Sequence, residues 1–94
     1  MKINVELKGR FKDVLKLPDP CPLELQDDIN VRDLLYRLCR DTGCSEDTFF
    51  NKDLRLKPNV AVTKNGRFII HLKWLDTPLD EGDIVTIFTL HCGG

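Results

Sequence analysis

The chain has 94 residues, which is enough for one domain with a compact core. Fourteen Lys and Arg residues against fifteen Asp and Glu residues give a formal net charge of −1, and there is no long basic block, so nucleic acid is a poor candidate partner. We expect no signal peptide and no membrane span. We therefore expect reduced cysteines and a cytoplasmic location.

The first half of the chain predicts two strands and one helix. Residues 2–8 alternate polar and apolar side chains, as a half-buried strand does. Residues 9–21 contain Gly and Pro and predict a loop, which leads to a second strand at 22–26. Asn30 can cap a helix over residues 31–42, whose apolar residues recur at helical spacing.

The second half predicts three further strands. Residues 44–57 show no clear period and are expected to be irregular. Strands at 60–63 and 67–70 flank Asn65-Gly66, a pair that suits a tight hairpin turn, and the last strand covers residues 84–90. This order predicts one α+β domain over residues 1–94, with a mixed sheet packed on one main helix.

The last predicted strand is apolar on both faces. Val85 and Ile87 share one face, whereas Ile84, Phe88 and Leu90 share the other. One helix covers only one face of a sheet, so Phe88 and Leu90 are candidates for an exposed surface that binds a partner protein. The alternative is that the two long loops cover them.

The sequence closes with Gly93-Gly94, which by itself is compatible with an ordinary frayed end. Glycine has no β-carbon, so such an arm can enter a narrow channel in a partner enzyme. ATP-dependent conversion of the Gly94 carboxylate to an acyl-adenylate would open it to a sulfur nucleophile and yield a thiocarboxylate. Cys92 could exchange groups with that terminus, although we favour an incidental thiol.

Several motifs in the second half resemble one known family over essentially the whole chain. The sequence is similar to the sulfur carriers of molybdenum-cofactor and thiamine biosynthesis, the MoaD and ThiS proteins, and most similar to the small subunit of molybdopterin synthase. The resemblance implies a ubiquitin-like β-grasp fold with a flexible Gly-Gly tail. The shared motifs are Leu56-Lys57-Pro58, Asn65-Gly66, Leu75-Asp76-Thr77-Pro78-Leu79, Glu81-Gly82-Asp83, Ile87-Phe88 and Gly93-Gly94.

The resemblance also implies a set of partners. An E1-like adenylating enzyme of the MoeB or ThiF type would use ATP to activate Gly94, and a sulfurtransferase or persulfide would supply the sulfur. The acceptor would be an enzyme such as the molybdopterin synthase large subunit. Phe88 matches an apolar position that packs against partner enzymes. The sequence departs from the family where Thr89-Leu90-His91-Cys92 replaces a frequent Pro-Pro segment, which leaves the acceptor open.

These patterns predict a sulfur-donating cosubstrate and not an enzyme. The Cys and His residues have no familiar zinc spacing, so we expect no metal and no bound cofactor. Gly93 and Gly94 are the predicted reacting residues. The predicted partner-binding residues are Ile84, Phe88, Leu90, His91 and Cys92. Molybdopterin or tungstopterin synthesis is the leading pathway, and the alternatives are thiamine or another metabolite, a protein modifier that forms isopeptide bonds through Gly94, and an interaction module that does not use the tail.

Overall fold

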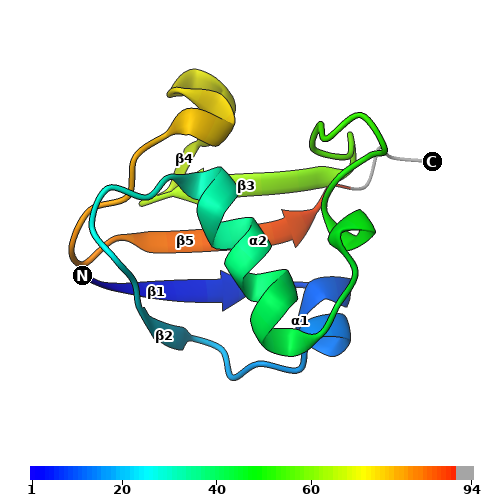
Figure 1. Cartoon of the computed structure of the whole chain (residues 1–94), viewed down its shortest axis with the longest axis horizontal. Coiled ribbons are helices and arrows are strands. Elements are labelled where there is room, and N and C mark those ends of the chain that lie inside the picture. Colours follow the sequence, from blue (N-terminus) through cyan, green and yellow to red (C-terminus); the bar gives the residue numbers. More distant parts are fainter. Residues whose placement is uncertain (91–94) are drawn as a thin grey trace.

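A five-stranded mixed sheet carries the fold in the computed structural model, which describes residues 1–90 (Figure 1). The strand order is β2-β1-β5-β3-β4. β1 and β5 pair in parallel at the centre, and the other pairs are antiparallel. The strands are β1 Lys2–Leu7, β2 Cys21–Glu24, β3 Val60–Lys64, β4 Arg67–Phe68 and β5 Ile84–Thr89.

One main helix, α2 (Val31–Thr42), crosses one face of this sheet, as predicted (Figure 1). Its start is fixed by a capping box in which the Asn30 side chain accepts a hydrogen bond from the Asp33 N–H at 2.9 Å, and the Asp33 carboxylate accepts one from the Asn30 N–H at 3.1 Å. Gly43 ends the helix at φ 74, a left-handed conformation that glycine adopts without a steric penalty. These local signals explain why the sequence predicts this helix well.

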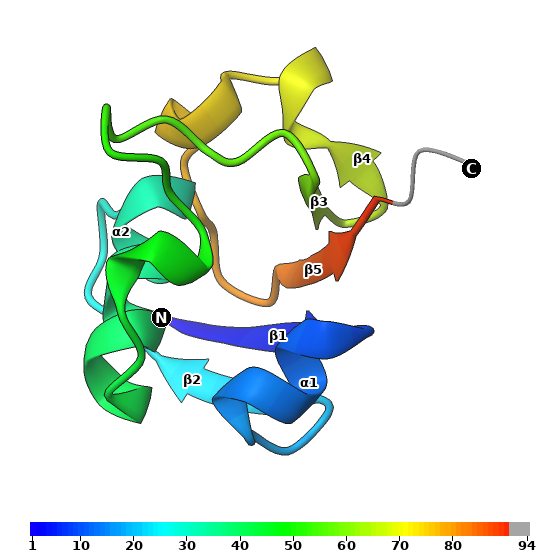
Figure 2. The same ribbon diagram turned by 90° about the vertical axis from the view of Figure 1, so that its right-hand side faces the viewer.

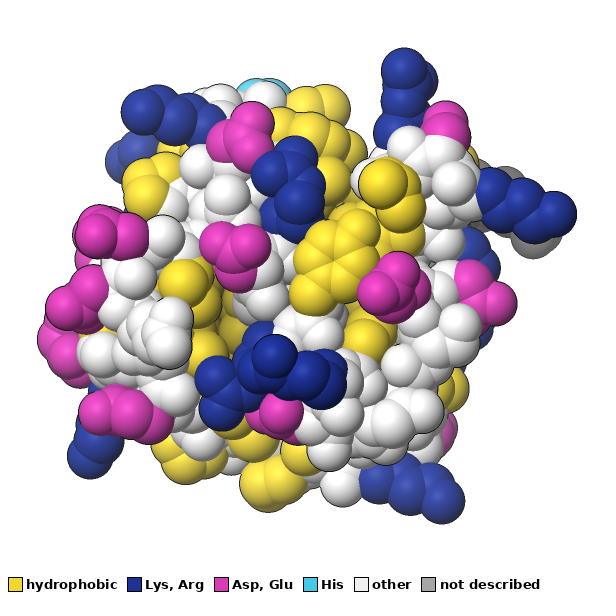
Figure 3. All heavy atoms as spheres, viewed as in Figure 1, with side chains coloured by type: hydrophobic (Ala, Val, Ile, Leu, Met, Phe, Trp, Pro, Cys, Tyr) yellow, Lys and Arg dark blue, Asp and Glu magenta, His cyan; other side chains and the backbone are white. Residues whose placement is uncertain are grey.

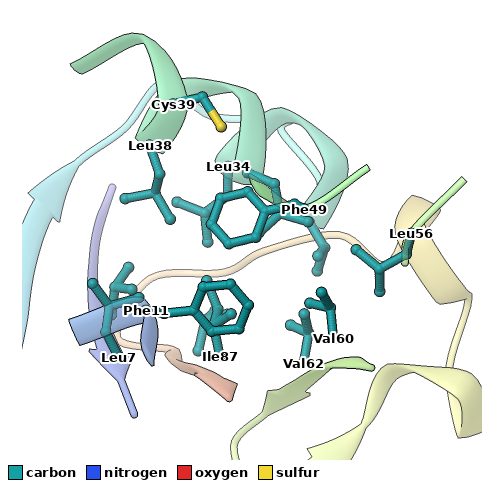
Figure 4. Close-up of a cluster of buried hydrophobic side chains, with 14 of the residues drawn as sticks. Leu7, Phe11, Leu34, Leu38, Cys39, Phe49, Leu56, Val60, Val62 and Ile87 are labelled. Carbon is teal, nitrogen blue, oxygen red and sulfur yellow. The ribbon is translucent and has the colours of Figure 1, made fainter. Parts of the chain in front are cut away.

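The core lies between α2 and the sheet, and Figure 4 shows side chains from both layers meeting there. The predicted loop over residues 9–21 is wrong in its first part, because it contains a short helix, α1 (Arg10–Leu15). Phe11 and Leu15 are four residues apart and therefore share one side of this helix, and both are buried. The Phe11 ring lies 5.3 Å from that of Phe49, measured between centroids.

The segment between α2 and β3 also contributes buried side chains to the core. It begins with a short 3₁₀ turn, η1 (Glu46–Thr48), where the Ser45 side chain accepts a hydrogen bond from the Asp47 N–H at 3.4 Å. Phe49 and Phe50 follow this turn and are buried. The segment is mostly irregular, as predicted, but it closes one end of the core.

β3 and β4 form the predicted hairpin, but β4 is shorter than predicted. Asn65 and Gly66 have φ values of 51 and 84, the left-handed values that a tight hairpin turn requires. β4 stops after two residues, because the buried Ile69 begins a 3₁₀ turn, η2 (Ile69–His71), which another turn, η3 (Trp74–Asp76), follows. β4 pairs with only the last two residues of β3. The edge of β3 at residues 60–62 is therefore not covered by β4.

The second face of the sheet lies opposite α2, as the end-on view in Figure 2 shows. Toward β1 this open face is polar, and the Thr86 hydroxyl donates a hydrogen bond to Glu6 Oε1 at 3.2 Å. Toward β4 it becomes apolar, and the rings of Phe68 and Phe88 meet edge to face at 5.9 Å between centroids. The prediction of a sheet packed on one main helix is therefore confirmed, with the short α1 adding to the core, and the apolar part of the open face lies at the β4 side.

Candidate functional site

The candidate site begins where β5 ends. β5 lies between β1 and β3, so both neighbours hold the strand that leads to the Gly-Gly segment. The Leu90 N–H extends this pairing by donating a hydrogen bond to the Asn59 carbonyl at 2.7 Å. His91, Cys92, Gly93 and Gly94, which the sequence predicts as site residues, lie outside the described residues. The sheet therefore fixes the point from which this segment starts.

The three other predicted site residues do not form one patch. Ile84 stands at the start of β5 and Leu90 just beyond its end, so at about 3.3 Å per residue they are roughly 20 Å apart. Phe88 is half-buried against Phe68, whereas Leu90 is 43% exposed. Phe88 and Leu90 thus lie at the end of β5 that precedes residue 91, and Ile84, although 42% exposed, belongs to the opposite end of the strand.

Leu90 borders an apolar groove that sequence reasoning missed. The groove has a volume of ≈ 170 Å³ and lies between the segment before β3 and the turns η2 and η3. We call it the β3 groove, and its lining residues are Leu56, Pro58, Val60, Ala61, Val62, Phe68, Ile69, Ile70, Trp74 and Leu90. The sequence assigned no role to Trp74 and placed Ile70 in a strand, so the only available signal was the apolar run after Asn65-Gly66.

The turn η3 holds Trp74 in an unusual backbone conformation. Its φ of 55 lies in the left-handed region, which bulky side chains seldom adopt. Thr77, which is 3% exposed, fixes this turn: its hydroxyl donates to the Trp74 carbonyl at 2.7 Å and accepts from the Lys73 N–H at 3.1 Å. The Thr77 side chain therefore sets where the indole stands.

Replacing Thr77 with valine keeps the shape of this side chain and removes both hydrogen bonds. We expect a loss of about 1 kcal/mol in the free energy of unfolding, because the Lys73 N–H loses its acceptor and the Trp74 carbonyl keeps only the Thr77 N–H as a donor. Urea unfolding followed by far-UV circular dichroism measures the loss, and the emission of the single tryptophan reports whether its surroundings change in the folded state. A variant with parent stability and parent emission would show that Thr77 does not hold the turn.

The acidic residues before β5 are engaged within the domain. Asp76 pairs with Arg32, and the Glu81 carboxylate accepts hydrogen bonds from the Lys2 N–H at 3.1 Å. Asp80 and Asp83 both pair with Lys64, at 3.0 and 3.2 Å. These contacts hold the segment before β5 in place.

Asp83 is the buried member of this group, with 6% exposure. Its carboxylate accepts hydrogen bonds from the Asn65 amide at 2.9 Å and the Asp80 N–H at 2.7 Å. Burial acts to raise the pKa of Asp83, but the hydrogen bonds and the Lys64 ammonium outweigh it and lower the pKa below its usual value. The hairpin turn at Asn65 and the start of β5 are thereby tied together through one carboxylate.

Cys39 is a thiol of the packed core. It is 3% exposed on the core side of α2. Burial, followed by the nearby Cys44, Glu46 and Asp47, raises the pKa of Cys39 to about 11, so its thiol stays protonated at neutral pH.

Among residues 1–90, no three His, Cys, Asp or Glu side chains are arranged to hold a metal ion. Over the same residues, no helix has the length and apolar character to cross a membrane.

Comparison with known proteins shows which family this chain belongs to. The sequence pattern of the ThiS family matches residues 14–94. Small archaeal modifier protein 3 of Haloferax volcanii is 46% identical over 43 residues, a match that covers 46% of this chain and only 47% of that protein. The chain thus aligns with about half the length of this curated relative.

Two solved structures have the same fold over the full length of this chain. The solution structure of the Haloferax volcanii HVO 2177 protein is 31% identical, with a TM-score of 0.80 and 87% of that chain covered. The crystal structure of small archaeal modifier protein 1 from the same organism superimposes with a TM-score of 0.83 at 21% identity, with both chains fully covered. The ubiquitin-like β-grasp fold is therefore confirmed, and the chain belongs to the ThiS family of ubiquitin-like carriers and modifiers.

Proposed function

We propose that this protein is a cytoplasmic sulfur carrier whose reacting group is the carboxylate of Gly94. One observation carries the proposal: the ThiS family match extends through Gly93-Gly94, and β5, held between two strands, leads directly into that segment. A short glycine arm on a rigid sheet suits delivery of a terminal group into the active site of another enzyme.

The chemistry needs a partner, because a carboxylate is a poor electrophile. An E1-like enzyme would transfer AMP from ATP to the Gly94 carboxylate and release pyrophosphate. A persulfide sulfur would then attack the acyl carbon and displace AMP, and reduction of the resulting acyl disulfide by a thiol would leave the thiocarboxylate. Gly93 and Gly94 supply only backbone to this reaction, so the protein acts as a cosubstrate and not as a catalyst.

The thiocarboxylate would pass its sulfur to an acceptor enzyme. Molybdopterin or tungstopterin synthesis is the leading pathway, with the molybdopterin synthase large subunit as acceptor, and thiamine or another sulfur-containing metabolite is the alternative. Phe88 and Leu90, together with His91 and Cys92, lie within six residues of Gly94 along the chain. They would contact the partner that receives the tail. Ile84 lies at the far end of β5, and its role in partner binding stays a prediction.

A second function has specific support. The 46% identity over 43 residues is to a protein named as a modifier. In this case a lysine amine of a target protein would attack the same Gly94 adenylate and displace AMP, giving an isopeptide bond. The two functions share the activation step and differ only in the nucleophile that follows.

Mass spectrometry after co-expression with the cognate adenylating enzyme tests the proposal. Intact masses and C-terminal fragments are compared between the parent and a chain without Gly93-Gly94. We expect replacement of one oxygen by sulfur at Gly94 in the parent and none in the truncated chain. Fragmentation is needed because oxidation of a Cys or Met side chain adds nearly the same mass.

Two other results would redirect the proposal. Gly94 joined to lysines of other proteins would favour the modifier. An unmodified Gly94, under conditions where the same enzyme activates another carrier, would contradict the activation step shared by both functions.

A further inference from the structure

A hollow beside the β3–β4 hairpin collects positive charge. It has a volume of ≈ 750 Å³ and lies between the hairpin turn, the link from η2 to η3, and the chain that follows η3. Three Lys and Arg residues line it, and within the described residues no Asp or Glu does. We call it the hairpin hollow, and its lining residues are Lys64, Asn65, Arg67, Leu72, Lys73, Thr77 and Pro78. A lining of this kind suits a negatively charged ligand.

The stretch of chain that forms most of this hollow is basic. Residues 54–75 contain five Lys and Arg residues and no Asp or Glu, although the whole chain has a net charge of −1. Figure 3 shows Lys and Arg side chains together at the upper left, over β4 and the turns that follow it in Figure 1. The positive charge is therefore concentrated at this corner of the domain.

One of the three cations is already neutralised within the domain. Lys64, whose side chain is 15% exposed, pairs with Asp80 at 3.0 Å and with Asp83 at 3.2 Å. Arg67 and Lys73 are exposed, and neither forms an ion pair in the described part of the chain. The charge that the hollow offers to a ligand is therefore that of Arg67 and Lys73.

Arg67 faces a like charge across the hairpin. It is in register with Lys64, so the two side chains lie on the same face of the sheet. Like charges directly opposite one another on neighbouring strands are unfavourable. Asp80 and Asp83 compensate Lys64 but do not pair with Arg67. An anion bound in the hollow would supply the negative charge that Arg67 lacks.

Lys73 reaches the hollow from a different element. It lies between η2 and η3, where its N–H donates to the Thr77 hydroxyl at 3.1 Å and its carbonyl accepts from the Asp76 N–H at 3.0 Å. Thr77 is 3% exposed, so these contacts anchor the Lys73 backbone to a buried residue. Two cations from separate elements thus border one concavity, and Leu72 and Pro78 give it an apolar part.

A small phosphate monoester fits this arrangement. Its phosphoryl group carries close to two negative charges at pH 7 and has three acceptor oxygens, so it can contact two cations at once. Arg and Lys both recognise phosphate in proteins. The volume lies within the range of roughly 300–1,000 Å³ for small-molecule sites, which leaves space for an organic group on the apolar part. Two cations are too few for the basic track that a nucleic-acid strand requires.

We propose that the hairpin hollow binds a small phosphate monoester of nucleotide size, with its phosphoryl group between Arg67 and Lys73 and its organic part against the apolar lining. The site lies away from the tail, because the Asn65 N–H donates to the Ile84 carbonyl at 2.8 Å, at the start of β5. This inference goes beyond the proposed function, because it concerns a ligand that this chain itself holds and not the chemistry at its terminus.

NMR titrations of the isotope-labelled full chain test the site. The ligands are AMP, adenosine and inorganic phosphate, and a pentaglutamate peptide probes for recognition of an acidic protein segment. The variants Arg67→Gln and Lys73→Gln each remove one cation from the hollow. Lys12→Gln is the matched control, since it changes the net charge equally at an exposed residue of α1 that does not line the hollow. Circular dichroism verifies that each variant is folded.

We expect AMP to shift the amide signals of residues 64–67, 72–73 and 77, phosphate to shift them with lower affinity, and adenosine to leave them in place. Arg67→Gln and Lys73→Gln should each weaken AMP binding by about fivefold or more, because a charged contact to the phosphoryl group is lost, and Lys12→Gln by less than about twofold. Higher salt should weaken binding. Deleting Gly93-Gly94 should leave the AMP affinity unchanged.

Four results would overturn the inference. They are the absence of AMP-dependent shifts at the hollow, adenosine binding as tight as that of AMP, equal weakening by Lys12→Gln and Arg67→Gln, and tighter binding of pentaglutamate than of AMP. The last result would assign the hollow to an acidic protein segment. None of the four bears on whether Gly94 is activated, so the two proposals can fail separately.

Discussion

A chain extended by one alanine after Gly94 is expected to lose thiocarboxylate formation by at least about a hundredfold, since displacing a reacting group by as little as 1 Å can cost that much. The extension moves the terminal carboxylate by one residue, about 3.3–3.6 Å of extended chain, and adds a β-carbon to an arm that otherwise has none at its last two positions. The domain itself should fold as the parent does, because every described element ends before residue 91.

The measurement is the rate of thiocarboxylate formation by intact mass spectrometry, with the cognate adenylating enzyme, ATP and a persulfide donor. Cys92→Ala is the comparison variant, because it alters the same segment and leaves the terminus in place. It removes only a side chain that would contact the partner, and most such truncations cost less than about 1 kcal/mol, so we expect its rate to stay within about fivefold of the parent rate. Conversion of the extended chain at the parent rate, with its added alanine still present, would mean that the enzyme does not act on the Gly94 carboxylate.

Asp83→Ala is expected to destabilise the domain by about 2–4 kcal/mol, because it removes the buried partner of an ion pair and leaves polar groups unpaired. The Asn65 amide and the Asp80 N–H both lose their acceptor, and Lys64, whose side chain is 15% exposed, keeps Asp80 and the Pro78 carbonyl. For a domain of this size the loss corresponds to a fall of roughly 10–20 °C in Tm. Thermal and urea unfolding measure it.

Asp80→Ala is the matched control for this prediction. The Asp80 side chain is 74% exposed and also pairs with Lys64, and the substitution leaves its backbone N–H in place. An exposed pair contributes little, so we expect a loss below about 1 kcal/mol. Equal losses for the two variants would show that burial of Asp83 is not what makes it important.

The Asp83 effect should also depend on pH. The pKa of Asp83 is lower in the folded protein than in the unfolded chain. Its contribution to stability is therefore present above the unfolded pKa of about 3.9 and is lost as the pH falls through the folded pKa. The difference in unfolding free energy between the parent and Asp83→Ala should shrink when urea unfolding is repeated at pH values from 7 to 3, and a constant difference would contradict the assignment.

Local patterns account for the elements that the sequence predicted well. The helix over residues 31–42 has its cap, its apolar stripe and its terminal glycine within a few residues of one another. The hairpin turn at Asn65-Gly66 is equally local. Such signals act between near neighbours, so they can be read without knowing the rest of the fold.

The missed features depend on residues far apart in the sequence. α1 forms because Phe11 packs against Phe49, and β4 ends early because Ile69 turns into the core. The β3 groove combines segments before β3, after β4 and after β5, so no single stretch of sequence indicates it. The roles of Gly93 and Gly94 remain predictions from the sequence and the family resemblance.

Because β5 lies in the middle of the sheet, the domain can fold only after the chain has been synthesised almost as far as the tail. β5 is the last strand in the described chain, yet it separates β1 from β3 and pairs with both. During synthesis the two halves of the sheet cannot join until β5 has left the ribosome, because neither half has another strand to pair with at that position. A chain cut short before β5 would expose two open sheet edges and remain a target for proteolysis. Cells would therefore accumulate this protein chiefly as molecules that have been synthesised through β5 and on toward Gly93-Gly94.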